Sequence, residues 1–212
     1  MKSIALMSQK GGSGKSTLVR NLGIIAALNN HEVLILDTDE QATVAEWYKD
    51  RPLEKRSQSP YVVSTEILHI KDALQKAETK GFDFVFIDTP GRHSPYLDKV
   101  IESVDFSLVP CRTTRDDIKA QIKTALQLQQ QKASFAFVAT QAPLRGFRRD
   151  VTFQSLESLG TVSPVQIPYL MDFQDGAACG LGVTEMNPAS RAAQSIQDLW
   201  DWLRDQMKED IL

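Results

Sequence analysis

Three short apolar runs, each followed by polar or acidic residues, constrain the fold of this chain more than any other feature. The stretches SIALMSQ (3–9), EVLILDTD (32–39) and FDFVFIDTPG (82–91) are apolar at most of their central positions. A strand with one solvated face alternates apolar and polar residues, so runs without alternation predict strands that are buried on both faces. Strands of this kind are typical of a parallel sheet between two layers of helices.

Helical patterns separate the apolar runs. We expect helices near 17–30, 66–79, 115–130, 149–159 and 189–208, and further strands at 61–64, 105–110, 134–140 and 165–168. Alternation of strands and helices implies parallel strands joined by right-handed crossovers. The sequence therefore predicts an α/β fold: a single P-loop NTPase domain over residues 1–212, with a mostly parallel, twisted sheet and helices on both faces. We expect RPLEKRSQSP (51–60) to be a polar surface loop.

The first apolar run leads through a glycine-rich stretch, QKGGSGKST (9–17), into a helical pattern. Glycines allow a tight turn that points successive backbone N–H groups at phosphate oxygens, and the following helix presents its positive end to the same anion. Lys15 can reach the β- and γ-phosphates, and the Ser16 hydroxyl can bind Mg²⁺. Gln9 replaces the first glycine of the usual pattern GxxxxGK[ST]. The expected nucleotide-binding residues are Gly11, Gly12, Ser13, Gly14, Lys15, Ser16 and Thr17.

Aspartates follow the second and third runs. Because strand side chains alternate, Asp37 and Asp39 are expected to leave the strand on the same side. They can coordinate Mg²⁺ and position an attacking water, or they can cap the next helix. Asp88 follows an apolar strand as the Mg²⁺-binding aspartate of a Walker B motif does, which places Thr89–Gly91 near the γ-phosphate. We therefore assign Ser16, Asp37 and Asp88 to the metal and Asp39 to the water.

These residues together resemble one family. Lys10–Ser16 matches KGGxGK[ST], the deviant Walker A motif of the ParA/MinD family of P-loop ATPases, at every defined position. Asp37–Gln41 matches the family's DxDPQ with glutamate in place of proline, and GLGVTEMNPASRAA (180–193) is similar to a ParA-type pattern before the last helix. The sequence most resembles short ParA-type partition or positioning ATPases that lack an N-terminal helix-turn-helix domain. One departure is that Tyr169–Met171 stands where ParA proteins often carry an arginine.

The resemblance implies ATP and Mg²⁺ as cofactors, slow hydrolysis to ADP and phosphate that a partner stimulates, and a homodimer in the ATP state. In this family the extra lysine, here Lys10, reaches across the dimer to the phosphates bound by the other subunit. Lys10 thus joins the nucleotide-binding residues and, with Lys15 and Asp39, the catalytic ones; the alternative is a solvated lysine. The implied partner is a centromere-binding or cargo-adaptor protein, and the implied location is the cytoplasm, on the nucleoid.

ParA-type relatives also bind DNA without sequence preference. The candidate contacts are Lys119, Lys123, Arg145, Arg148 and Arg149, although a solvated charged face is the alternative in a chain of net charge −3. Two functions stay open: partition of DNA or positioning of a cargo by an ATP-dependent dimer, and a nucleotide-gated assembly factor of a conjugation, secretion or polysaccharide-synthesis apparatus. A DNA-binding assay that compares ATP, ADP and no nucleotide distinguishes them.

Membrane and metal-cluster functions are not expected. No apolar run reaches the roughly 20 residues that span a bilayer. The final helix has an acidic polar face, which an anionic membrane repels, and an apolar face that we expect to pack on the core: Ile196, Leu199, Trp200, Leu203 and Met207. Cys111 and Cys179 lie far apart in the sequence and fit no metal or redox spacing, so we expect two buried thiols.

Overall fold

A computed structural model describes residues 1–92, 94–143 and 154–209 and contains one seven-stranded sheet. Its strands are β1 (Lys2–Leu6), β2 (Val33–Asp37), β3 (Tyr61–Ser64), β4 (Phe84–Asp88), β5 (Phe106–Arg112), β6 (Phe135–Ala142) and β7 (Val162–Pro168). The strand order is β3-β2-β4-β1-β5-β6-β7, and every neighbouring pair is parallel. The parallel sheet expected from the apolar runs is confirmed.

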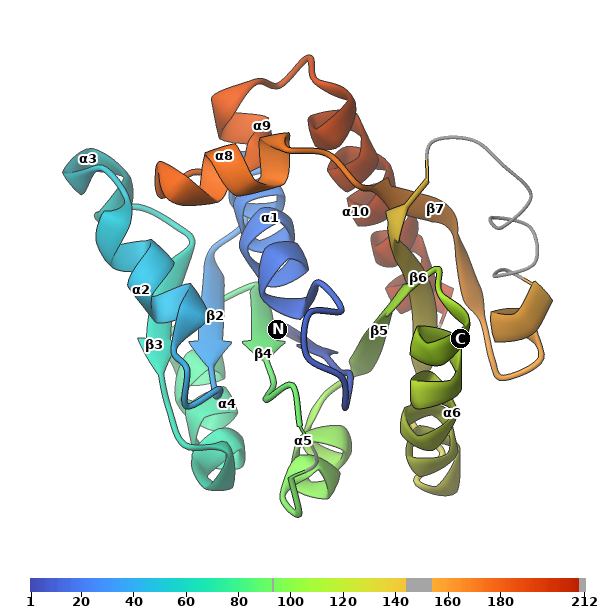
Figure 1. Ribbon diagram of the computed structural model, residues 1–212. Coiled ribbons are helices and arrows are strands. Elements are labelled where there is room, and N and C mark those ends of the chain that lie inside the picture. Colours follow the sequence, from blue (N-terminus) through green and yellow to red (C-terminus); the bar gives the residue numbers. More distant parts are fainter. Residues whose placement is uncertain (93, 144–153, 210–212) are drawn as a thin grey trace.

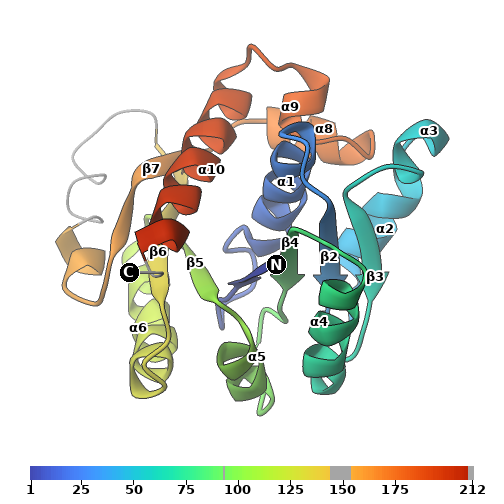
Figure 2. The same cartoon turned by 180° about the vertical axis from the view of Figure 1, so that it is seen from behind.

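Helices cover both faces of this sheet (Figure 1; Figure 2 from behind). They are α1 (Lys15–Leu28), α2 (Thr43–Asp50), α3 (Leu53–Arg56), η1 (Ile67–His69), α4 (Ile70–Thr79), α5 (Leu97–Ser103), α6 (Arg115–Gln130), α8 (Asp172–Ala178), α9 (Val183–Met186) and α10 (Arg191–Glu209). Side chains of α1, α2, α8, α9 and α10 pack on one face, and those of η1, α4, α5 and α6 pack on the other. The two cores that result make the fold a three-layer sandwich.

Several local expectations need correction. The segment 51–60 is not simply a polar loop, because it contains α3 and the buried Arg51. Short helices also form where no helix was expected, at α2, α5, α8 and α9. Part of the helix expected near 149–159 lies outside the described residues, and residues 154–157 are helical.

The last helix packs as its sequence predicts. Ile196, Leu199, Trp200, Leu203 and Met207 are all buried in the core on its side of the sheet. The indole of Trp200 meets the ring of Phe84 edge-on, with 5.0 Å between ring centroids. Such aromatic contacts add packing energy beyond the area they bury.

Only one of the two cysteines matches its prediction. Cys111 is buried in β5, where burial raises the pKa of its thiol to about 12. Cys179 is exposed just after α8, so the expectation that it would be buried was wrong.

The sheet brings the polar residues at its strand ends together. β1 lies at the centre, between β4 and β5, and the chain adds strands on one side of β1 first and then on the other. In parallel α/β sheets ligands bind beyond the carboxyl ends of the strands at such a reversal. Leu6 and Asp37 both pair with Asp88, and Arg112 pairs with Thr140, so the segments after these strands meet at one edge.

Candidate nucleotide site

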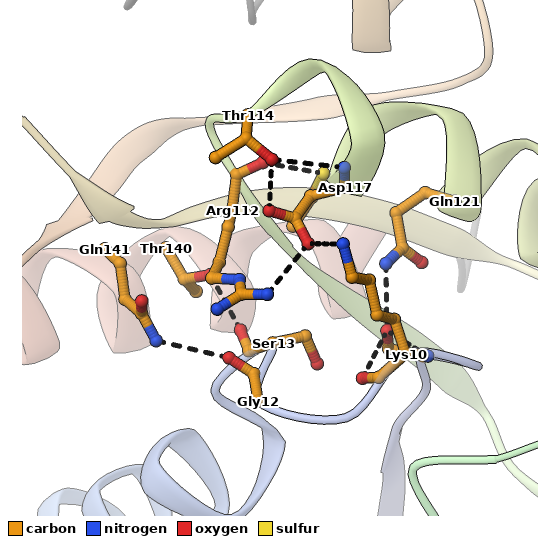
Figure 3. A network of polar contacts seen from close by, with 11 residues as sticks. Lys10, Gly12, Ser13, Arg112, Thr114, Asp117, Gln121, Thr140 and Gln141 are labelled. Carbon is orange, nitrogen blue, oxygen red and sulfur yellow. Dashed lines mark hydrogen bonds and ion pairs between the residues drawn. The ribbon is translucent and has the colours of Figure 1, made fainter.

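The glycine-rich loop between β1 and α1 is held in a preformed shape. Gly12 and Gly14 have φ angles of 74° and 101°, in the left-handed region that favours glycine. The end of β6 supports the loop from the side: the Thr140 hydroxyl donates to the carbonyl oxygen of Ser13 at 2.7 Å, and the Gln141 amide donates to that of Gly12 at 3.2 Å (Figure 3). The loop therefore requires little rearrangement to receive an anion.

A pocket of about 690 Å³ opens over this loop. Its lining brings together residues 11–17, all of the predicted loop residues after Lys10, and it adds Arg20, Asp39, Glu40, Gln41, Thr43, Gly91, Arg92 and Gln141. The volume lies within the range of small-molecule and cofactor sites. The pocket is therefore large enough for a nucleotide, and every residue that lines it is a glycine or a polar or charged residue.

Lys15 is the buried cation of this pocket and is only 6% exposed. Burial lowers the pKa of its ammonium, and the nearby carboxylates of Asp88 and Asp39 oppose that shift. Gly91, in the segment after β4, lies so close that a Cβ there would be 3.4 Å from Nζ of Lys15 and 3.2 Å from Cα of Gly11. The structure thus places the loop after β4 against the glycine-rich loop, as the order of motifs predicts.

Asp88 is completely buried, and among the described residues neither of its carboxylate oxygens has a partner within 3.5 Å in hydrogen-bonding geometry, although the hydroxyl of Ser16 is close enough to affect its pKa. Burial raises the pKa of Asp88 to about 7; the hydroxyl of Ser16 and the ammonium of Lys15 lower it, and Asp37 and Asp39 raise it. A buried carboxylate without a partner is costly, and a cation relieves that cost. This orphaned pair of oxygens, with Ser16 beside it, fits a Mg²⁺ ion that takes its remaining ligands from phosphates and water.

The two aspartates that follow β2 have different partners. Asp37 accepts hydrogen bonds at Oδ2 from the backbone N–H groups of Val44 and Ala45, at 3.0 and 2.9 Å, and at Oδ1 from that of Asp39 at 3.2 Å. It therefore caps α2, which is the alternative left open by its sequence pattern. Asp39 instead lines the pocket, because β2 ends at Asp37 and strand alternation no longer applies beyond it. The metal-binding role of Asp37 stays a prediction.

Lys10 does not line the pocket, whose lining begins at Gly11. Its ammonium is 2.6 Å from Oδ1 of Asp117, a residue of α6 whose side chain is 3% exposed. The guanidinium of Arg112 donates to the same oxygen at 3.1 Å, and the hydroxyl of Thr114 donates to Oδ2 (Figure 3). The lysine of the deviant motif is thus bound within its own chain.

Sequence reasoning missed several of these residues. Arg20 had a usable signal, because it lies four residues after Ser16 and so on the same face of α1. Arg112 and Asp117 had none, since they are distant from the loop in sequence and meet it only through the pairing of β1 with β5. Buried contacts of this kind become visible only in three dimensions.

The predicted DNA contacts are only partly described. Lys119 and Lys123 are exposed on α6, as expected from their spacing. Two large aliphatic side chains on the same helix are also exposed, Ile122 at 38% and Leu126 at 50%. The remaining candidates, Arg145, Arg148 and Arg149, lie outside the described residues.

Two features are absent from the part of the chain that the structure describes. Among residues 1–92, 94–143 and 154–209, no group of three or more His, Cys, Asp or Glu side chains is arranged to hold a metal ion. A Mg²⁺ ion that relies on one or two carboxylates, phosphates and water does not need such a group. Nor does this part of the chain contain a helix long and apolar enough to cross a membrane.

Comparison with known proteins gives a consistent picture. The model of the VirC1 protein family matches residues 1–152. The chain is 29% identical to the protein virC1 of Rhizobium rhizogenes over 127 residues, which cover 58% of this chain and 54% of that protein. It is 31% identical to a probable plasmid-partitioning protein ParA of Thermus thermophilus over 119 residues, 55% of this chain and 31% of that protein. The chain thus spans about half the length of the virC1 relative.

A solved structure supports the fold. The septum site-determining protein MinD of Pyrococcus horikoshii, complexed with Mg-ADP, superposes with a TM-score of 0.75 and covers 95% of both chains at 16% sequence identity. At this level of identity the likeness concerns the fold, and it agrees with a P-loop NTPase.

Proposed function

The chain belongs to the VirC1 protein family and is related to the ParA/MinD-type ATPases, and from that premise we propose that it is an ATP-dependent partition or positioning ATPase. It binds ATP with Mg²⁺, dimerises around two nucleotides, and hydrolyses ATP slowly to ADP and phosphate until a centromere-binding or cargo-adaptor protein stimulates it. In this scheme the ATP dimer binds DNA without sequence preference, and hydrolysis releases it.

The nucleotide would occupy the pocket over the glycine-rich loop. Backbone N–H groups of residues 11–17 and the ammonium of Lys15 neutralise the phosphates, while Ser16 and Asp88 hold Mg²⁺. A smaller cavity of about 90 Å³ adjoins the loop at Gly14 and Thr17 and is lined by Tyr169, Leu170 and Phe173 among others. A purine base fits the chemistry of that mostly apolar surface.

Hydrolysis requires a positioned water and stabilisation of the charge that develops on the phosphates. Asp39 is half-buried, lines the pocket and is the candidate to orient the water. Lys15 stabilises the phosphates of its own subunit, and Lys10 of the partner subunit supplies a second cation in the manner of an arginine finger.

The observation that carries the proposal is that the two lysines of the motif lie in different places. Lys15 lines the pocket, whereas Lys10, five residues earlier, is one-third exposed and outside it. We infer that a lysine outside the pocket of its own subunit serves the nucleotide of a second subunit.

The test is whether dimerisation depends on ATP. Sedimentation measures the fraction of dimer in the presence of Mg²⁺ with ATP, with ADP or without nucleotide. The wild-type chain should dimerise only with ATP. Lys10→Ala should bind ATP as a monomer but neither dimerise nor hydrolyse it. A Lys10→Ala protein that dimerises and hydrolyses ATP normally would exclude the sandwich dimer.

DNA binding is tested separately by titrating salt at fixed nucleotide. The ATP form should bind DNA of any sequence, with an affinity that falls steeply as salt rises. Exchange of Lys119 and Lys123 for glutamate should weaken that binding. Absent or ATP-independent binding would exclude DNA as the substrate of the dimer.

The exposed aliphatic residues of α6 favour a second candidate, a nucleotide-gated assembly factor of a conjugation, secretion or polysaccharide-synthesis apparatus. Ile122 and Leu126 share the face of Lys119 and Lys123, and exposed apolar residues among charges are more typical of a protein-binding surface than of a phosphate-binding one. Here Ile122→Ser with Leu126→Ser should leave DNA binding intact and abolish assembly with the protein partner.

A further inference from the structure

We propose that Asp117 is a positioning residue that holds Lys10 inside its own subunit when no nucleotide is bound, and that Arg112 takes over the charge of Asp117 when Lys10 moves to the partner's phosphates. The inference rests on the proposed ATP dimer. It adds to that function a free-energy cost: the ion pair between Lys10 and Asp117 must break before Lys10 can contact the phosphates of a second subunit.

Asp117 cannot be left without a cation. Its side chain is 3% exposed. Burial alone would raise the pKa of Asp117, but hydrogen bonds from Lys10, Thr114 and Arg112 outweigh burial and leave it below its ordinary value. The carboxylate is therefore charged, and its partners stabilise that charge.

Asp117 has two cations where one suffices. Oδ1 accepts from Lys10 at 2.6 Å and from Arg112 at 3.1 Å, and Oδ2 accepts from Thr114 (Figure 3). When Lys10 leaves, Arg112 and Thr114 still satisfy both oxygens. The ammonium and the guanidinium repel each other while they share one oxygen, and this repulsion ends when Lys10 departs.

The backbone at Lys10 is anchored while its side chain is free to turn. The hydroxyl of Ser8 accepts a hydrogen bond from the N–H of Lys10 at 3.3 Å and another from the amide of Gln121, on α6, at 2.8 Å. The side chain of Lys10 remains 33% exposed. A change in the direction of the side chain therefore suffices to transfer the ammonium from Asp117 to another anion.

The test compares three variants in the same sedimentation assay, with Mg²⁺ and a non-hydrolysable ATP analogue. Asp117→Asn removes the charge that retains Lys10, so its dimer dissociation constant should be about tenfold lower than that of the wild type, or about 1.4 kcal/mol. Arg112→Gln removes the cation that takes over, so its constant should be about tenfold higher. Asp116→Asn is the control: it makes the same charge change at the neighbouring exposed position of the first turn of α6 and should leave the constant within about twofold.

Opposite shifts separate this role from a structural one, because loss of packing at either residue would weaken the dimer in both variants. The affinity of the monomers for a fluorescent ATP analogue, measured below the dimer dissociation constant, should be the same for all three. Should Asp117→Asn fail to fold, as judged by circular dichroism, Asp117→Ser takes its place, because it also removes the charge: a dimer dissociation constant equal to or above that of the wild type overturns the proposal.

The failure of this inference is distinguishable from failure of the proposed function. If the wild type dimerises with the ATP analogue but Asp117→Asn dimerises no more readily, Asp117 does not restrain Lys10 and the ATPase proposal stands. If neither the wild type nor Asp117→Asn dimerises although both bind the analogue, the sandwich dimer and the inference are both wrong.

Discussion

A buried ion pair joins two distant parts of the chain and should be among its most sensitive positions. The carboxylate of Glu185 in α9 accepts from both terminal nitrogens of Arg51, at 3.0 and 2.9 Å, and from the N–H of Gly182 at 3.0 Å. The side chains of Arg51 and Glu185 are only 1% and 6% exposed. The guanidinium also lies 4.9 Å from the ring centroid of Trp47, so it is enclosed on that side as well.

Replacement of Glu185 by alanine would leave the guanidinium of Arg51 buried without its counter-ion. Removing one partner of a buried pair typically costs about 3–5 kcal/mol of unfolding free energy. For a chain of this size that corresponds to a melting temperature about 6–20 °C lower. Glu46→Ala is the matched control, because Glu46 forms an ion pair with Lys49 in which both side chains are exposed. This variant should lose less than about 1 kcal/mol of unfolding free energy.

The assay is urea unfolding of wild type, Glu185→Ala, Arg51→Met and the double variant at pH 7. The double variant should be less destabilised than the sum of the single variants, since it leaves no buried charge unpaired. The ammonium of Lys55, which also contacts Glu185 at 3.0 Å, is 36% exposed and stays solvated when the carboxylate is removed. The pKa of Glu185 is held below its ordinary value of 4.5 by Arg51, despite burial. The ionised carboxylate therefore stabilises the fold above that ordinary value, and this contribution is lost as the pH falls through the lowered pKa. A loss below about 1 kcal/mol for Glu185→Ala, or strict additivity in the double variant, would refute this reasoning.

Three further predictions concern the nucleotide site. Lys15→Ala should abolish ATP binding in an equilibrium dialysis assay, because the pocket would lose its buried cation; near-normal affinity would mean that the phosphates bind elsewhere. Asp39→Ala should bind ATP but hydrolyse it at least about tenfold more slowly in a phosphate-release assay, leaving the dimer trapped; an unchanged rate would assign the water to another residue. The pKa of Asp88 is raised to about 7, so the folded chain binds an extra proton below that pH and the nucleotide-free protein should lose about 2 kcal/mol of unfolding free energy between pH 5.5 and 7.5. In the Asp88→Asn variant the unfolding free energy should not show this loss between pH 5.5 and 7.5. The same pH dependence in the variant and in the wild type would contradict the prediction.

The sequence predicted the sheet well because its strands are buried on both faces. All five residues of β2 are buried, for example, and such a run leaves little choice of structure. The short helices were missed for the opposite reason: α5 and α8 have seven residues each and bury only two or three of them, too few to establish a helical period. Both helices pack mainly on other helices, α5 on α4 and η1 and α8 on α2 and α9, and no local pattern encodes such contacts.

In the candidate site, too, some residues could be predicted from the sequence and others could not. The glycine-rich loop carries its chemistry in consecutive residues, so its position could be predicted from spacing alone. Asp37 caps α2 whereas Asp39 lines the pocket, and this difference depends on where β2 ends. Sequence patterns locate the ends of strands poorly. The contacts of Asp117 with Lys10, and of Glu185 with Arg51, join residues more than 100 positions apart, as their numbers show. Neither pair has a spacing that any motif could reveal.

The central place of β1 has a consequence for synthesis of the chain. β1 is made before both of its neighbours, and it pairs with Phe84–Asp88 of β4 and then with Phe106–Leu108 of β5. At about 5–20 residues per second, the ribosome needs roughly 4–16 s to supply the first of these partners. During that interval the glycine-rich loop has no sheet to support it. A chain released before β4 emerges therefore carries the complete phosphate-binding motif and still cannot form the pocket.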